Sequence, residues 1–464
     1  MVEKTADLVV IGGGLAGFAA ALEAAESGLN VLLVEKLGDV GGSSAMSAGC
    51  LAFAGTDLQR GQGIEDSTEL LFRDLRELGE LENDESIVQA YVASQLSTYR
   101  WLCAKGAMFS PVIEAGSGQS VPRVHTIDPA DVVRLLARLC RETGRVEVLM
   151  ETAARRLVRN PQTGRVDGVI AACGELALTL IAKRAVLLAC GGFVNNRDLI
   201  RRFAPAYADA ILIGGEGNVG DGLRMAWQLG ADFRDVAHIK GSFGKHPIDT
   251  HNNHPCLAVY KGAIAVNQHG DRYVDESISY KLLGDACLAQ PFNCTYQILD
   301  QDIFEQGDDR VRILDFNRRL EEGQMISAES LDQLARMIDV PADALQLTVD
   351  KYNGFVLAGE DPEFGRKHLV HNGGDLRQIK RPPFYAYPSA AAVYGTYCGV
   401  CTDAGMRVLD VFGEVIDGLL AAGEMVGGLH GAGHMPGSSL AKAAIFGRIA
   451  ARTAAGLEAP TVND

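Results

Sequence analysis

The feature that most constrains this sequence is its start, where an apolar strand, a glycine-rich turn, a helix and a second strand follow one another. Leu8–Ile11 is a short apolar run, and the spacing Gly12-x-Gly14-x-x-Gly17 predicts a turn into a helix. Val31–Val34 predicts the second buried strand. In such a unit the first glycine allows the tight turn, the second lets the backbone approach a pyrophosphate, and the third lets helix pack on strand. The start of the chain therefore predicts a dinucleotide site, with phosphates at the helix N-terminus.

The residues around this turn extend the predicted site. Glu35 ends the second strand about 20 residues after the turn, where a carboxylate accepts hydrogen bonds from ribose hydroxyls and repels a 2′-phosphate. A second glycine pattern, Gly215–Gly220, follows only a short apolar run, and a charged stretch rather than a strand follows its helix. We therefore expect no second nicotinamide site, and an unknown electron acceptor or donor must serve as partner.

Length, charge and cysteine usage limit the remaining possibilities. A chain of 464 residues predicts two or more domains, and a net charge of −16 argues against nucleic acid or an anionic membrane surface as partner. No apolar run reaches the roughly 18 residues of a membrane span, and the chain enters a strand almost at once, so we expect a cytoplasmic protein. The ten cysteines are scattered, and the pair Cys398 and Cys401 lacks a second pair with ligand spacing, so we expect neither a disulfide framework nor a metal site.

Helical spacing over 66–110 predicts helices that cover a sheet, and apolar runs at 146–150, 165–172 and 185–190 predict further strands. Near 237 the chain becomes more polar, and residues 262–276 alternate around a His-Gly turn, which predicts a hairpin. Towards the end, a Pro-Gly-Ser-Ser run opens an alanine-rich helix with free N–H groups.

Several of these segments together resemble a known family of flavoproteins. The segments are Gly41–Gly49, Ala189–Phe193, Asn218–Ala226, Gly262–Glu276, Gly418–Glu424 and His430–Arg448. They resemble the fumarate reductase and succinate dehydrogenase flavoproteins, a family that also includes 3-ketosteroid dehydrogenases and tricarballylate dehydrogenase. The resemblance spans nearly the whole chain. It implies an α/β fold, with a Rossmann-like FAD-binding domain over 1–236 and 371–464 and an inserted α+β capping domain over 237–370.

The resemblance also implies the cofactor and its ligands. Members that attach flavin covalently carry a histidine where this chain has Ser43, so FAD is expected to bind non-covalently. Glu424 is implied to bond the ribityl chain, and the last helix to point at the flavin. The residues expected to bind FAD are Gly12, Gly14, Leu15, Ala16, Gly17, Glu35, Lys36, Gly41, Gly42, Ser43, Ser44, Ser47, Gly49, Ala189, Gly191, Gly192, Asp221, Gly423, Glu424, Ser438, Ser439 and Leu440.

The substrate side departs from fumarate reductases, which bind two carboxylates through histidines and arginines. The family's proton-donor arginine falls at Val259 and its carboxylate-binding arginine at His434, so the bidentate guanidinium contacts are lost and fumarate is not the expected substrate. The groups near these positions are aromatic or neutral: Tyr260, Tyr394, Tyr397, His434 and Met435.

A tyrosine is the candidate acid or base. Asp275–Tyr280 is similar to the Asn-Glu-Ser-x-x-Tyr segment of ketosteroid dehydrogenases, whose tyrosine is the catalytic base, although Met435 replaces their second tyrosine. Tyr280 would need a positive neighbour, which Lys261 or His434 could supply. Alternatively Tyr280 is a packed hairpin aromatic. His125, in the polar loop 121–126, is a weaker candidate and could equally be a solvated loop histidine.

Three functions are compatible with these residues. The favoured one is an FAD-dependent oxidoreductase acting on a CH–CH bond next to a carbonyl of a small molecule, by dehydrogenation or ene reduction, with hydride transfer at flavin N5 and a tyrosine acid or base. An alternative is a polycarboxylate oxidoreductase of the tricarballylate type, whose Tyr-Pro-Gly-Gly-Ser-Gly-Leu loop resembles Met435–Leu440. A third is a flavin-binding subunit without turnover.

Overall fold

The computed structural model describes residues 2–116, 118–248, 255–369 and 374–460. It divides the chain into two compact units. The first contains Met1–Pro205, Gly214–Ile239 and Gly395–Asp464, and the second contains Ala206–Ile213 and Lys240–Tyr394. Each unit has its own hydrophobic core. The chain enters the second unit first at Ala206–Ile213 and again at Lys240, and residue 370, the expected return, lies outside the described residues. The chain stays in the second unit as far as Tyr394 because its strand there pairs with strands of that unit.

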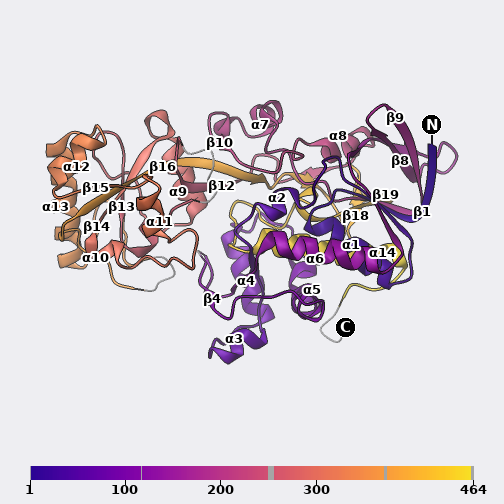
Figure 1. The fold of residues 1–464 in the computed structure, drawn as a ribbon, viewed down its shortest axis with the longest axis horizontal. Coiled ribbons are helices and arrows are strands. Elements are labelled where there is room, and N and C mark those ends of the chain that lie inside the picture. Colours follow the sequence, from indigo (N-terminus) through magenta and orange to yellow (C-terminus); the bar gives the residue numbers. More distant parts are fainter. Residues whose placement is uncertain (1, 117, 249–254, 370–373, 461–464) are drawn as a thin grey trace. The chain divides into compact units, whose positions relative to one another are not determined.

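A mixed sheet forms the centre of the first unit (Figure 1). Its main order is β18-β19-β9-β1-β2-β6, and β8 joins β9 while β7 joins β8. Pairing is parallel between β1 and β2, β1 and β9, β2 and β6, and β19 and β9, which confirms the Rossmann-like sheet. The strands are β1 (Val2–Ile11), β2 (Val31–Val34), β6 (Val146–Leu149), β7 (Thr152–Arg159), β8 (Val166–Cys173), β9 (Leu176–Leu188), β18 (Arg407–Leu409) and β19 (Val415–Ala421).

Three helices, α1 (Leu15–Glu26), α6 (Pro129–Glu142) and α14 (Ser438–Ala455), lie side by side in the first unit (Figure 1). The alanine-rich helix α1 is buried along nearly its whole length. A side chain at Gly447 would come within 2.4 Å of the Ala16 carbonyl oxygen, so glycine lets α14 pack directly on α1. The buried pair Arg448 and Glu23, at 2.8 Å, links the same two helices. This packing holds the start of α14 near the glycine turn.

The rest of the first unit consists of helices and short strands. Two small sheets, β3-β5-β4 and β11-β17, complete its strand content in the described residues. These elements are α2 (Gly42–Ala45), β3 (Cys50–Ala52), α3 (Asp57–Gly61), α4 (Thr68–Leu78), α5 (Glu85–Ala104), β4 (Ile113–Glu114), β5 (Val124–Thr126), α7 (Arg197–Phe203), α8 (Asp221–Gln228), β11 (Phe233–Arg234), β17 (Gly399–Val400) and η5 (Gly423–Met425). The short helix η1 (Pro205–Tyr207) begins at the last residue before the chain enters the second unit. Helices α4 and α5 fall in the stretch 66–110, where helical spacing predicted helices, whereas α3 precedes that stretch.

The second unit is built on a sheet of order β10-β16-β14-β13, with β12 and β15 also paired to β16. Its elements are β10 (Ile211–Leu212), β12 (Ile239–Lys245), η2 (Ala258–Lys261), β13 (Ile264–Val266), α9 (Tyr280–Leu288), η3 (Pro291–Asn293), β14 (Thr295–Asp300), α10 (Gln301–Phe304), α11 (Phe316–Glu321), β15 (Ile326–Ala328), α12 (Leu331–Met337), α13 (Ala342–Ala358) and β16 (Phe384–Thr396). Figure 1 shows α12 and α13 beside this sheet.

The hairpin predicted over 262–276 is wrong. β13 pairs with β14, and its own return segment makes only a single bridge between Val266 and Arg272. In the return segment, Arg272 instead forms buried ion pairs with Glu276 and Asp361 at 2.7–2.9 Å. Tyr280 accordingly lies at the start of α9 and not in a hairpin.

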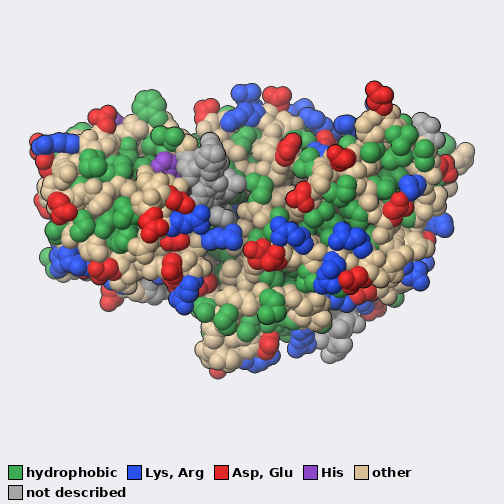
Figure 2. Space-filling model, in the orientation of Figure 1, with side chains coloured by type: hydrophobic (Ala, Val, Ile, Leu, Met, Phe, Trp, Pro, Cys, Tyr) green, Lys and Arg blue, Asp and Glu red, His purple; other side chains and the backbone are tan. Residues whose placement is uncertain are grey.

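Two features concern possible partners: the distribution of charge on the surface and the length and polarity of the helices. On the face drawn in Figure 2, Lys and Arg side chains are interspersed with Asp and Glu. No helix in the described ranges is both long and apolar enough to cross a membrane.

Candidate cofactor and active site

The glycine turn after β1 has the shape that the sequence predicts. A side chain at Gly12 would come within 2.5 Å of the Ala189 carbonyl oxygen, and one at Gly17 within 1.9 Å of the Gly12 carbonyl oxygen, so close backbone packing requires both glycines. Gly14 differs from them. A side chain there would have Ser44 Oγ as its nearest neighbour, at 3.4 Å, so the space beside Gly14 is open to a ligand.

The acid and the base at the end of β2 contact two other expected cofactor segments. Glu35 accepts hydrogen bonds from the Gly13 amide at 2.8 Å and from the Leu37 amide at 2.9 Å, which fixes its carboxylate beside the glycine turn. Lys36 donates to Asp221 at 2.7 Å, and Asp221 is the first residue of α8. The structure thus brings Glu35, Lys36 and Asp221 to the same edge of the sheet.

The loop of small residues after β2 uses its hydroxyl groups to join separate segments. Ser43 Oγ accepts from the Gly215 amide at 2.8 Å, and Ser44 Oγ accepts from the Leu15 amide at 3.2 Å. Ser47 Oγ accepts from the Gly49 amide at 3.2 Å. These serines connect the loop with the start of α1 and with the segment before α8.

Glu424 lies beside the turn at Gly191 and Gly192. Its carboxylate accepts from the Thr396 amide at 2.8 Å and from Asn218 Nδ2 at 2.7 Å. A side chain at Gly192 would come within 2.6 Å of Glu424 Oε1, which explains the glycine. Asn218 opens the segment Asn218–Ala226, which resembles the family, but only Asp221 of that segment was among the residues expected to bind cofactor.

The start of α14 carries a cluster of buried hydroxyl groups and rings. His434 Nε2 is 2.8 Å from Ser439 Oγ, and the His434 ring is nearly parallel to the Tyr397 ring, with centroids 6.1 Å apart. The His430 ring lies 4.7 Å from Tyr397 and 5.1 Å from His434. Ser438 Oγ donates to the Met435 carbonyl at 2.7 Å. His430 opens the segment His430–Arg448 but was not among the expected site residues.

The three candidate tyrosines belong to the second unit. Tyr280 is the first residue of α9, which Ser279 caps. Tyr260 lies in η2, next to the fully buried Val259. The Val259 amide donates to the Gln297 side chain, and the Val259 carbonyl accepts from Arg366. The Tyr394 hydroxyl is buried, and burial raises the pKa of this phenol, so Tyr394 is a neutral hydrogen-bond donor.

His125 is neither a solvated nor a loop residue. It lies in β5, fully buried among the rings of Phe53, Tyr99 and Phe109. Its Nδ1 donates to the Arg123 carbonyl at 3.0 Å, so its Nε2 accepts from the Thr56 hydroxyl at 2.8 Å. Burial lowers the pKa of His125 to about 4, which makes it a neutral packing residue at pH 7.

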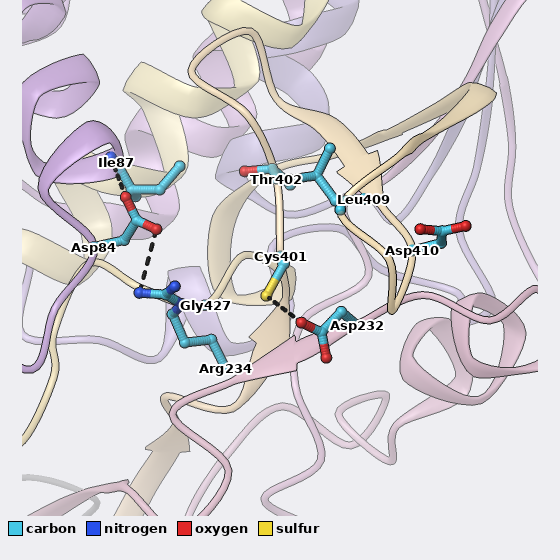
Figure 3. A pocket seen from close by; sticks show the side chains of 10 residues that line it. Asp84, Ile87, Asp232, Arg234, Cys401, Thr402, Leu409, Asp410 and Gly427 are labelled. Carbon is cyan, nitrogen blue, oxygen red and sulfur yellow. Dashed lines mark hydrogen bonds and ion pairs between the residues drawn. The ribbon is translucent and has the colours of Figure 1, made fainter.

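A hollow of about 200 Å³ elsewhere in the first unit contains none of the expected cofactor or catalytic residues (Figure 3). Arg234 pairs with Asp84 at 3.2 Å on one side, and the Cys401 thiol faces Asp232 on the other. Burial raises the pKa of Cys401 to about 11 and that of Cys398 to about 12, which keeps both thiols protonated and poorly nucleophilic at neutral pH. Among the described residues, no group of three or more His, Cys, Asp or Glu side chains could hold a metal ion.

Comparison with known proteins identifies the family. The model of the FAD binding domain family matches residues 7–440. The chain belongs to this FAD-binding family. It is 30% identical over 460 residues to a probable fumarate reductase of Shewanella frigidimarina, covering 97% of this chain and 75% of that protein. It is 29% identical over 447 residues to a vinyl phenol reductase of Lactiplantibacillus plantarum, covering 90% and 89%.

A solved structure with the same fold is that of 3-ketosteroid-Δ4-(5α)-dehydrogenase from Rhodococcus jostii RHA1, with 4-androstene-3,17-dione bound. It superposes with a TM-score of 0.79 at 26% identity, covering 98% of each chain. The chain is therefore an FAD-dependent oxidoreductase of the fumarate reductase-like flavoproteins.

The helix starts of this family member fit an anionic cofactor. Side chains cap α4, α5, α6 and α9, whereas the N-cap residues of α1 and α14 are Gly14 and Gly437, which have no side chain to cap the helix. Neither α1 nor α14 has an acidic residue in its first turn. Such ends leave backbone N–H groups and the positive end of the helix dipole for a ligand. The residues present therefore fit FAD.

Proposed function

We propose that this flavoprotein oxidises or reduces a carbon–carbon bond next to the carbonyl of an uncharged or weakly charged small molecule, with Tyr280 as acid or base. The observation that carries the proposal is the identity of His434. A buried imidazole, hydrogen-bonded to Ser439 and stacked on Tyr397, occupies the position where the resemblance implies a carboxylate-binding arginine. An imidazole cannot make the bidentate contact of a guanidinium with a carboxylate.

Other groups support an uncharged substrate. Val259 is an apolar core residue where the implied proton donor is an arginine. The buried rings of Tyr397, His430 and His434 offer planar aromatic surface without a guanidinium or carboxylate. The relatives act on a range of compounds, since their names include a reductase of a vinyl phenol and a dehydrogenase of a ketosteroid.

The chain's own residues have distinct tasks in this proposal. Bound FAD supplies the site that accepts or donates hydride. Tyr280 Oη takes a proton from the carbon next to the carbonyl, or returns one in the reverse direction. Its place in the first turn of α9, which contains no acidic residue, puts it at the positive end of a helix dipole. Tyr394, a buried neutral phenol, can donate a hydrogen bond to the carbonyl oxygen.

The test is stopped-flow measurement of flavin absorbance with a panel of saturated ketones, ketosteroids, enones and polycarboxylates. Ketones are mixed with the oxidised protein and enones with the reduced protein. We expect flavin absorbance to change rapidly with some of the ketones, ketosteroids or enones. Change with carboxylates alone would replace this proposal by a carboxylate oxidoreductase, and no change with any compound would leave a flavin-binding subunit.

The matched variant is Tyr280→Phe, which keeps the ring and removes the hydroxyl. We expect FAD binding to be unchanged and the rate of flavin reduction to fall by about 10²–10⁴-fold, the usual contribution of a general acid or base. Unchanged kinetics in this variant would remove Tyr280 from the mechanism while leaving the substrate class open to the panel.

A carboxylate substrate is the second candidate because of the identity to a probable fumarate reductase. In that case Lys261 or an arginine of the second unit would have to replace the missing guanidinium. The same panel separates the two substrate classes.

A further inference from the structure

Asn218 lies in the loop that precedes α8 and is 4% exposed. Its side chain makes three hydrogen bonds to three different segments. Nδ2 donates to Glu424 Oε2 at 2.7 Å and to Ser43 Oγ at 3.3 Å, while Oδ1 accepts from the Val194 amide at 3.0 Å. Asn218 thereby uses both amide hydrogens and its carbonyl oxygen.

The partners of Asn218 are themselves fixed. Ser43 Oγ also accepts from the Gly215 amide, so both of its acceptor positions are used. The other oxygen of Glu424 accepts from the Thr396 amide and hydroxyl at 2.8 and 3.3 Å. A side chain at Gly191 would come within 2.9 Å of Asn218 Nδ2, so the glycine turn also packs against this amide. One asparagine therefore links the serine loop, the turn after β9 and the acid before α14.

We propose that Asn218 is a positioning residue for FAD, which orients Glu424 and Ser43 and keeps Glu424 a solitary carboxylate. A donor at this position satisfies one oxygen of Glu424 without bringing a second negative charge. Glu424 then keeps its remaining lone pair for a hydroxyl group of the cofactor. An aspartate at position 218 would have the same shape as the asparagine but would add a negative charge beside Glu424. Two carboxylates at this separation share a proton, so Glu424 would no longer be a solitary carboxylate.

The experiment is FAD titration of the apoprotein between pH 5.5 and 9, in wild type and in Asn218→Asp. In the variant, the carboxylates of residues 218 and 424 share a proton. Bound FAD excludes water from this pair, so the pKa of the shared proton is higher in the complex than in the apoprotein. Binding then takes up a proton, so Kd rises with pH by up to about tenfold per pH unit relative to wild type. At the acid end of the range the shared proton restores the hydrogen bond and most of the affinity.

Two further variants make the test specific. Asn218→Leu removes the hydrogen bonds without adding charge, so we expect weaker FAD binding with the wild-type pH profile. Combining Asn218→Asp with Glu424→Gln exchanges donor and acceptor, and should remove the added pH dependence. The apoprotein melting temperature of each variant reports folding separately. Wild-type Kd for Asn218→Asp across the pH range would overturn the proposal, and so would a pH dependence that the exchange does not remove.

Discussion

Replacing Gly14 by alanine should separate cofactor binding from folding. Gly14 has φ −85° and ψ −173°, an extended conformation that alanine adopts without strain. The added methyl group would have Ser44 Oγ at 3.4 Å and the Gly41 carbonyl oxygen at 3.8 Å as its nearest neighbours, both ordinary contacts. The cost to the apoprotein is that of alanine in place of glycine at a helix start, below about 1 kcal/mol.

The cost to FAD binding is larger. The methyl group fills the space through which the pyrophosphate is expected to approach the backbone of α1. Loss of one charge-assisted hydrogen bond costs about 1.5–3 kcal/mol, which corresponds to a rise in Kd of about 10–150-fold. Quenching of FAD fluorescence on titration with apoprotein measures Kd, and thermal unfolding of the same apoprotein measures the fold.

The matched control is Gly17→Ala, one helical turn further along. Its methyl group would lie 1.9 Å from the Gly12 carbonyl oxygen, so this variant must shift α1 and should lower the melting temperature of the apoprotein. Wild-type FAD affinity in Gly14→Ala would refute the placement of the pyrophosphate beside Gly14. A wild-type melting temperature in Gly17→Ala would refute the packing argument.

Three further predictions follow from single side chains. His434→Arg should raise kcat/KM for a carboxylate-bearing alkene by at least about tenfold, since a guanidinium adds charge-assisted hydrogen bonds, and no gain in steady-state assays would show that this position does not face substrate. Burial lowers the pKa of His125 to about 4, below its unfolded value of about 6.5, so its contribution to stability is present above pH 6.5 and is lost between pH 6.5 and 4. Urea unfolding should show this loss of stability in wild type and a smaller loss in His125→Phe. Equal losses in the two proteins would contradict the role of His125. Arg123→Met leaves Asp66 and Asp74 without their 2.9 Å partner and should lower the free energy of unfolding by about 3–5 kcal/mol in urea titration, so a change below about 1 kcal/mol would contradict the role of these two buried ion pairs.

The local patterns of the sequence predicted the first unit well. The alternation of apolar runs and glycine turns is set by neighbours in the chain, so β1, α1 and β2 and the start of α14 follow from composition and spacing. The contacts between distant segments did not follow. Lys36 bonds Asp221, and Asn218 bonds Glu424, because the fold brings separate loops to one sheet edge, and no periodicity records such pairs.

The errors have physical reasons as well. Alternation over 262–276 indicated a hairpin, but the return segment makes only the Val266–Arg272 bridge. The Glu276 carboxylate, which is paired with Arg272, accepts a hydrogen bond from the Ala265 amide of β13, so a buried side chain bonds this amide. Polar neighbours made the segment around His125 resemble a surface loop. Its polar groups are in fact paired internally, since Arg123 bonds Asp66 and Asp74 in the interior. Hydrophilic composition indicates exposure only when the polar groups lack partners in the fold.

The parallel pairing of β19 with β9 has a consequence for synthesis. The stretch Val186–Leu188 of β9 is translated long before its neighbour Leu419–Ala421, and the whole second unit leaves the ribosome between them. Until then, that stretch offers unpaired amide and carbonyl groups to other nascent chains. A ribosome stalled before residue 415 thus holds a form in which this edge is open to strand-mediated aggregation, and FAD can enter its complete site only after α14 has been made.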